Sequence, residues 1–172
     1  VILYCGATPV FVDILRDTYN IDPSKIAVKL TTRTKAIIPV HLFGLCADMD
    51  LIRAVVPGHI KIIEDAACAV GASYQGKWAG TLGDVASFSF HPRKTITTGE
   101  GGMVTTNNPD LWSRMWSYKD HGKSWKAVFE KDHPPGFRWL HESFGTNWRM
   151  TEMQAAIGRI QLTRMDGWSA RR

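Results

Sequence analysis

Two nearly continuous apolar runs constrain the fold of this chain more than any other feature of its sequence. One covers residues 35–41 and the other covers residues 60–63. Strands that are buried on both faces have this composition. The stretch between the runs predicts a short helix that begins at a cap, Asp48, and ends near Val55. Strands that alternate with helices at this spacing predict an α/β fold, an α/β/α sandwich with a mostly parallel central sheet.

Similar patterns predict elements before and after this unit. A helix is expected from Pro23 to about Leu30, because Asp22 can cap it and proline suits the first turn. A hairpin is expected over residues 73–81, and an irregular segment over residues 119–145. The other expected strands are Val1–Cys5, Val10–Ile14, Val85–Phe90 and Gly102–Thr106, and the other expected helices run from Asn108 to about Tyr118 and from Thr151 to about Met165. The last helix carries one apolar stripe, made of Met153, Ala156, Ile157, Ile160 and Met165.

Composition and charge bear on the class of protein. With 172 residues, 44% of them hydrophobic, the chain can form one globular domain with a core. It has no apolar run long enough to cross a bilayer, so no membrane association is expected. The net charge of +5 comes from dispersed basic residues, so nucleic-acid binding is not expected. A mild attraction to phosphates or sugar nucleotides fits this charge.

Three scattered cysteines, Cys5, Cys46 and Cys68, show no spacing typical of metal ligands. They favour a reducing, cytoplasmic location, and no metal site is expected. The chain begins without Met inside an apolar run, and it lacks the basic region of a signal peptide. We therefore expect a piece of a longer protein.

The segment from Ser87 to Val104 contains a lysine in an unusual position. An apolar strand ends in a His-Pro turn, Lys94 follows the turn, and the loop Gly99-Glu100-Gly101-Gly102 comes next. An amine that follows a buried strand and lies among aromatic side chains is partly desolvated, which favours the nucleophilic form that Schiff-base chemistry needs. A lysine at a strand end can equally be a solvated surface residue, so this segment alone leaves both interpretations open.

Two further polar residues, Asp65 and Ser89, are expected near the carboxyl ends of strands, where ligands of parallel sheets bind. Pyridoxal phosphate needs a lysine for the imine, a carboxylate at the pyridine nitrogen, and hydroxyls with backbone amides at the phosphate. Asp65, Lys94 and Ser89 can supply these groups. Each also has a structural interpretation, since Asp65 can cap a helix or form an ion pair and Ser89 can simply be a small strand residue.

On a longer scale, the chain resembles the DegT/DnrJ/EryC1/StrS family of pyridoxal-phosphate sugar aminotransferases, which have the aspartate-aminotransferase-like fold. The motif Phe88-Ser89-Phe90-His91-Pro92-Arg93-Lys94, followed by Thr97-Thr98-Gly99-Glu100-Gly101-Gly102, is highly specific for this family. Further matching stretches, in family order, are residues 6–13, 36–44, 63–67, 83–84, 120–122, 145–150 and 154–158.

The resemblance implies a role for individual residues. Lys94 would form the imine with the cofactor and move the proton, and Asp65 would pair with the pyridinium nitrogen. Ser89 would bind the cofactor phosphate. Asn147 would reach the phosphate of the neighbouring subunit's cofactor, because family members share active sites across a homodimer interface. Many family members have Gln or His near the cofactor's ring hydroxyl at the place of Cys68, and a thiol is a weaker hydrogen-bond partner.

The resemblance also implies the reaction. An amino-acid donor, glutamate in most of the family, would give its amino group to a keto group of a nucleotide-activated sugar, for polysaccharides or natural products. Residues 1–172 would be the central part of the cofactor-binding large domain, without its N-terminal phosphate loop and without the C-terminal small domain. The alternatives are a sugar dehydratase of the same family, in which histidine replaces the lysine, and a non-catalytic chain that keeps the fold. A plain nucleotide-binding α/β domain would have a Gly-rich turn between its first strand and helix, whereas Thr97–Gly102 runs into a strand.

Overall fold

The computed structural model describes residues 1–136, 138 and 140–171. Within them, a four-stranded sheet has the order β1-β2-β5-β6, in which β1, β2 and β5 are parallel and β6 is antiparallel to β5. The strands are β1 (Ala36–Ile37), β2 (Lys61–Asp65), β5 (Val85–Ser89) and β6 (Gly102–Thr105), with a separate hairpin of β3 (Ser73–Tyr74) and β4 (Lys77–Trp78). The expected α/β class with a mostly parallel sheet is confirmed, as is the hairpin.

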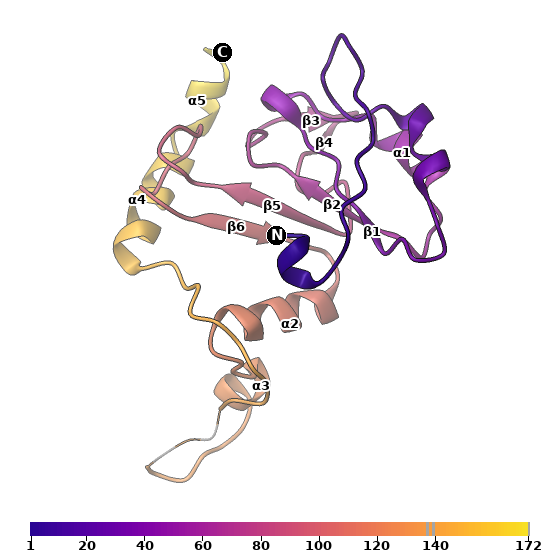
Figure 1. Ribbon diagram of the computed structural model, residues 1–172. Helices are drawn as coiled ribbons and strands as arrows, with labels where there is room; N and C mark the ends of the chain where they lie inside the picture. The colour runs from indigo at the N-terminus through magenta and orange to yellow at the C-terminus, as the bar shows by residue number, and fades with distance from the viewer. Residues whose placement is uncertain (137, 139, 172) are drawn as a thin grey trace.

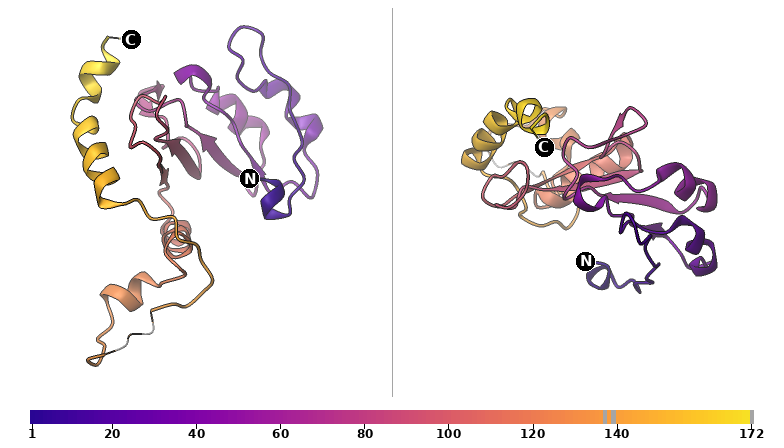
Figure 2. Two further views of the ribbon diagram at one scale, coloured as in Figure 1. Left: turned by 60° about the vertical axis from the view of Figure 1, so that its left-hand side comes forward. Right: turned by 90° about the horizontal axis from the view of Figure 1, so that it is seen from above.

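The helices after Asp48, Asn108 and Thr151 begin where the capping patterns predict, and the described residues contain five α-helices in all. They are α1 (Met49–Val55), α2 (Pro109–Lys119), α3 (Trp125–Phe129), α4 (Glu152–Leu162) and α5 (Met165–Ser169). Asp48 caps α1, Asn108 caps α2, and Thr151 forms a capping box with Gln154 at the start of α4. Figure 1 shows α4 and α5 beside one end of β5 and β6, with α1 on the far side of the sheet, and Figure 2 agrees. No helix among the described residues is both long and apolar enough to cross a bilayer.

The hydrophobic core lies against one face of the sheet. Along β2, Ile62 and Glu64 are buried, whereas Ile63 and Asp65, which point to the other face, are only half-buried. The buried cluster consists of Ile26, Ile37, Cys46, Ala47, Met49, Ile52, Val56, Ile60, Ile62, Ala66, Ala69, Ala79 and Leu82. The core therefore joins α1 to β1 and β2, on the opposite face from Asp65.

The second covering layer of the expected sandwich is present only in part. Met103 and Val104 are neighbours in β6 and therefore point to opposite faces of the sheet, yet each is 49% exposed. Burial of both faces of the sheet is thus incomplete at β6 within this chain.

The N-terminal expectations were wrong. Val1–Cys5 is not a buried strand: Leu3–Cys5 forms a 3-10 turn, and Tyr4 is 95% exposed. The turn ends at Gly6, whose N–H donates back to the carbonyl of Leu3. The next expected strand, Val10–Ile14, is reduced to one bridge between Ile14 and Ile21. Apolar composition alone does not make a strand, because a strand also needs a partner that pairs with its backbone.

Two expected elements in the interior lie at the predicted residues but are less regular than predicted. Asp22 accepts a hydrogen bond from Ser24 N as predicted, but the helix breaks into 3-10 turns at Pro23–Lys25 and Ala27–Lys29. The expected strand over residues 35–41 keeps only β1 and a bridge between Val40 and Asp65. Proline at position 39 has no N–H to donate, which interrupts the ladder between them.

The C-terminal part also differs from expectation. The segment 119–145 contains α3, and the long helix ends at Leu162 before α5 begins at Met165. The apolar stripe of α4 does not face the core, since Met153 is 77% exposed, Ile157 49% and Ile160 56%.

The carboxylate of Glu64 is fully buried in the core face and accepts hydrogen bonds from four N–H groups. Its Oε2 accepts from His41 Nε2 at 2.9 Å and from Gly80 N at 2.7 Å. Its Oε1 accepts from Leu82 N and Gly83 N, both at 2.6 Å. One side chain of β2 therefore anchors the segment that follows β1 and the turn that leads to β5.

The protonation of this pair follows from its neighbours. The N–H of Ala47 donates to Nδ1 of His41 at 3.1 Å, so Nδ1 carries no proton and Nε2 is the donor to Glu64. Burial raises the pKa of the Glu64 carboxyl, but the hydrogen bonds from His41, Gly80 and Gly83 outweigh burial, and the pKa lies below its usual value. Glu64 is therefore an ionised carboxylate beside a neutral imidazole.

Replacing this carboxylate should destabilise the fold. Glu64→Gln turns an amide N–H₂ toward N–H donors, and we expect a loss on the order of 3 kcal/mol in the free energy of unfolding from urea titration. Because the pKa of Glu64 is lowered in the folded state, its contribution is complete above the usual pKa and is lost as pH falls through the lower folded value. The difference between the two proteins should therefore be constant above about pH 5 and shrink below about pH 4.

A matched control is Glu100→Gln, since the Glu100 side chain is exposed. It should change the free energy of unfolding by less than about 0.5 kcal/mol. A Glu64→Gln protein as stable as this control would contradict an anchoring role for Glu64.

Candidate active site

The parallel pairing of β2 with β5 brings the predicted site residues to one edge and one face of the sheet. Asp65 is paired with Ser87, and Ser89 lies two residues further along β5, so all three point to the same face. This is the face opposite Glu64 and the hydrophobic core. Asp65 and Ser89 therefore lie at the carboxyl ends of adjacent parallel strands, as predicted.

The backbone of Asp65 is held on both sides of its strand position. Its N–H donates to Pro39 O at 2.9 Å, and its carbonyl accepts from His41 N at 3.0 Å. In its side chain, Oδ1 accepts from Ala67 N at 3.1 Å. Among the described residues Oδ2 has no hydrogen-bond partner, so one oxygen of a fixed carboxylate remains available to a ligand.

The turn after β5 returns the chain toward β2. Ser89 Oγ accepts from His91 N at 3.3 Å, which leaves the hydroxyl proton of Ser89 free to donate. Nδ1 of His91 accepts from Arg93 N at 3.2 Å, and the carbonyl of His91 accepts from Lys94 N at 2.9 Å. Hydrogen bonds within the turn thus occupy His91, and the turn orients Lys94.

Lys94 and Cys68 meet at the same edge. The amine Nζ of Lys94 donates to Sγ of Cys68 at 3.0 Å, and Lys94 is half-buried. Cys68 follows Asp65 by three residues, so this contact joins the loop after β2 to the loop after β5. Asp65, Cys68, Ser89 and Lys94, which are far apart in the sequence, therefore form one cluster.

Asn147 does not join this cluster. Asn147 forms an antiparallel bridge with Asp120, and none of its hydrogen bonds within the described part of the chain reaches the four clustered residues. The buried Asp120 carboxylate pairs with Lys123 at 3.2 Å and with Arg149 at 3.4 Å. Burial raises the pKa of Asp120, but the two cations outweigh it and lower that pKa. The ion pairs of Asp120 with Lys123 and Arg149 thus hold the segment that contains Asn147 in place.

The glycine-rich loop needs its glycines for two reasons. Gly99 has a φ of +82°, a conformation that side chains rarely adopt. A Cβ on Gly102 would lie 2.7 Å from the carbonyl oxygen of Phe88 in the neighbouring strand. The loop after Lys94 therefore turns tightly and enters β6 in close contact with β5.

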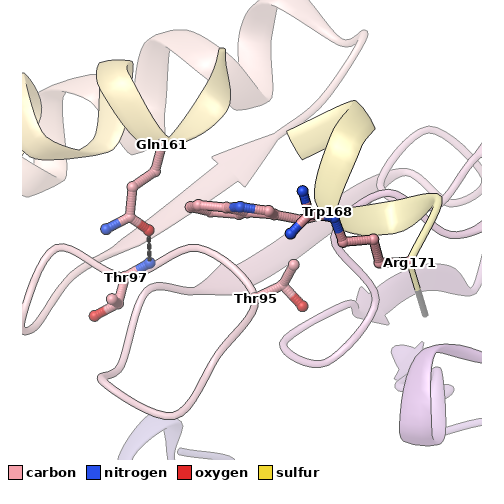
Figure 3. Close-up of a pocket in the computed structure, with 5 residues that line it drawn as sticks. All are labelled: Thr95, Thr97, Gln161, Trp168 and Arg171. Carbon is pink, nitrogen blue, oxygen red and sulfur yellow. Dashed lines mark hydrogen bonds between the residues drawn. The ribbon is translucent and has the colours of Figure 1, made fainter. Parts of the chain in front are cut away.

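A pocket of about 450 Å³ lies on the α4–α5 side of the lysine loop. It is lined by Thr95, Thr97, Gln161, Trp168 and Arg171, whose side chains Figure 3 shows gathered around it. No group of three or more His, Cys, Asp or Glu side chains with the geometry of a metal site occurs in residues 1–136, 138 and 140–171.

The sequence analysis missed the residues that support the cluster from a distance. Glu64 and His41 were given no supporting role, although their hydrogen bonds fix the strand that carries Asp65 and the segment beside it. Gln161 was not singled out, although its side chain accepts from Thr97 N in the lysine loop. Partners more than twenty residues apart leave no local pattern, and the only sequence signal was that a Glu directly follows the apolar run 60–63.

Comparison with known proteins agrees with the resemblance seen in the sequence. The model of the DegT/DnrJ/EryC1/StrS aminotransferase family matches residues 1–172. GDP-perosamine synthase of Caulobacter vibrioides is 49% identical over 166 residues, which cover 96% of this chain and 42% of that protein.

Two solved structures are also similar. The aminotransferase from Psychrobacter cryohalolentis has a TM-score of 0.95 at 57% identity, over 98% of this chain and 43% of that chain. The PLP form of Spr1654 from Streptococcus pneumoniae has a TM-score of 0.84 at 31% identity, over 96% of this chain and 45% of that chain. The chain spans less than half the length of each of these relatives. The match along its whole length shows that this chain belongs to the DegT/DnrJ/EryC1/StrS aminotransferase family.

Proposed function

We propose that this chain is the central part of a pyridoxal-phosphate-dependent aminotransferase that moves an amino group from an amino acid, glutamate, to a keto group of a nucleotide-activated sugar. The observation that carries the proposal is the cluster of Asp65, Cys68, Ser89 and Lys94 at the carboxyl ends of β2 and β5. The name of the Caulobacter vibrioides relative supports a nucleotide sugar as substrate.

The residues of the cluster fit the cofactor. Asp65 presents a fixed carboxylate with one oxygen available, which suits a protonated pyridine nitrogen. Ser89 keeps a hydroxyl proton that can be donated to a phosphate oxygen. The Nζ of Lys94 lies beside the thiol of Cys68. Cys68 stands where many family members have the residue near the cofactor's ring hydroxyl. Bound pyridoxal phosphate supplies an aldehyde for attachment to an amine and an electron-poor ring that takes up the electron pair of a broken Cα–H bond.

Each residue then has a separate task. Lys94 would hold the cofactor through Nζ and, as a free amine, would take the proton from the donor's Cα. Asp65 keeps the ring nitrogen protonated, because a carboxylate stabilises that positive charge. Ser89, together with backbone amides, would hold the phosphate and so orient the cofactor relative to Lys94.

The alternatives are less consistent with these residues. The dehydratases of the family have a histidine in place of the lysine, and this chain has Lys94. A chain that only binds would have no need for an amine at the same sheet edge as an oriented carboxylate, so the combination of Lys94 and Asp65 favours catalysis.

We also propose a homodimer with shared active sites, working in the cytoplasm. Asn147 lies apart from the cluster of its own chain, as a residue that serves the neighbouring subunit would. The exposed apolar stripe of α4 supports a second copy of the chain as its cover. All three cysteines are free, which agrees with a reducing compartment.

The half-reaction with the amino donor tests the proposed chemistry. In the protein expressed from its full reading frame and supplied with pyridoxal phosphate, L-glutamate should yield 2-oxoglutarate, measured by mass spectrometry. Lys94→Ala should abolish this product, and Asp65→Asn should slow it on the order of a hundredfold to a thousandfold, because the ring nitrogen loses its counter-charge. Asp17→Asn, at an exposed position, is the matched control. An Asp65→Asn protein as fast as this control would refute the role of Asp65.

Mixed dimers test the shared site. A Lys94→Ala chain and an Asn147→Ala chain should each be nearly inactive alone. After random mixing, half of the dimers contain one chain of each kind, and each mixed dimer has one intact site, so about a quarter of the wild-type rate should return. If Asn147 serves its own subunit, mixing restores nothing.

A further inference from the structure

Helix α4 is bound to the segment that follows Lys94 at two points. The N–H of Thr97 donates to Oε1 of Gln161 at 2.8 Å, as Figure 3 shows. Nε2 of Gln154 donates to the carbonyl of Glu100 at 2.8 Å. Gln154 and Gln161 lie seven residues, about two turns, apart on the helix, so they project from the same face. The two glutamines therefore form hydrogen bonds with both ends of the segment 97–100.

The middle of this segment rests on the same helix. Gly158 is buried, and a Cβ placed there would lie 3.1 Å from Cγ2 of Thr98. Thr98 is itself buried, at 4% exposure. The glycine lets α4 approach the loop closely enough for both glutamines to reach it.

The segment 97–100 closes the loop that carries Lys94. The N–H of Thr98 donates to the carbonyl of Phe90 at 3.1 Å, and Oγ1 of Thr97 donates to the same carbonyl at 3.0 Å. Lys94 lies between these points, and its own N–H is bound to the carbonyl of His91. Any movement of Thr97 therefore shifts the far end of a closed loop that has Lys94 in its middle.

We propose that Gln154 and Gln161 are positioning residues, which fix this loop and so set where the Lys94 amine lies relative to Cys68 and Asp65. Gln154 has a second bond, because its Oε1 accepts from Thr151 N at 2.9 Å in the capping box of α4. Helix α4, which begins five residues after Asn147, is thus capped with the help of the same side chain that holds the lysine loop. The positioning of the loop by the two glutamines does not depend on the function proposed above. Its importance for the reaction rests on that proposed function.

The two glutamines use different atoms, which makes one substitution a test of both. Gln161 accepts a hydrogen bond from the loop, so Gln161→Glu keeps the acceptor, whereas Gln161→Leu removes it. Gln154 donates to the loop, so Gln154→Glu keeps the acceptor of the capping box but sets a carboxylate oxygen against the Glu100 carbonyl. The same change of Gln to Glu should therefore be tolerated at position 161 and disruptive at position 154.

The first measurement uses the full-length protein without cofactor. Amide hydrogen exchange at Thr97 should be at least about tenfold faster in Gln161→Leu than in the wild type, and near the wild-type rate in Gln161→Glu. The rate at which an acylating reagent labels Lys94 should change severalfold in Gln161→Leu and in Gln154→Glu. Thr163→Ala is the control, since it removes a hydrogen bond at the end of α4 that does not involve the loop.

The second measurement uses the protein loaded with pyridoxal phosphate. The pH midpoint of the cofactor's visible absorbance should shift by about half a unit or more in Gln161→Leu and Gln154→Glu, and stay within error in Gln161→Glu and Thr163→Ala. A purely structural contact would leave this midpoint unchanged. The proposal is overturned if Gln161→Leu leaves exchange, labelling and midpoint at wild-type values, or if Gln161→Glu behaves like Gln161→Leu. Altered exchange in a protein that fails to bind the cofactor would leave the positioning of the loop standing and refute the proposed function instead.

Discussion

The hydrogen bonds of the Glu64 carboxylate are the interaction on which the rest of the structure depends. A charge in a hydrophobic core is unfavourable unless it is fully paired, and here four N–H groups, from His41 and from the turn 80–83, supply the pairing. The same bonds fix the segment after β1 and the turn before β5. Asp65 follows Glu64 directly and points to the opposite face, so the site inherits its geometry from this buried anchor.

Parallel pairing then turns sequence separation into proximity. β2 and β5 end at the same edge, which places Asp65 and Ser89 on one face, and the turn after β5 returns Lys94 to the thiol of Cys68. Helix α4 closes the arrangement from outside the sheet, by holding the loop after the lysine. Three sets of contacts therefore build the site: the pairing of β2 with β5, the turn that carries Lys94, and the hydrogen bonds from α4. Only the strands and the lysine turn have a local signal in the sequence.

That division explains what the sequence could predict. The caps at Asp48 and Thr151 have signals within a few residues of themselves, and the structure confirms them. The structure brings Asp65 and Lys94 to neighbouring strand ends, and their roles at the cofactor stay predictions. The strand at Val1–Cys5 was wrong because an apolar run does not reveal whether a partner strand is present. The pairing of Gln161 with Thr97 spans sixty-four positions and could not be found from local pattern. Asn147 is the case that a single chain cannot test, since its proposed partner lies in another subunit.

The central claim is that Lys94 is the residue that holds pyridoxal phosphate, and trapping tests it most directly. The full-length protein is incubated with pyridoxal phosphate, reduced with borohydride and digested, and the modified peptide is identified by mass spectrometry. We expect the label on Lys94, and its loss in Lys94→Arg. A label on another lysine of a folded protein, or no label at all, would contradict the account.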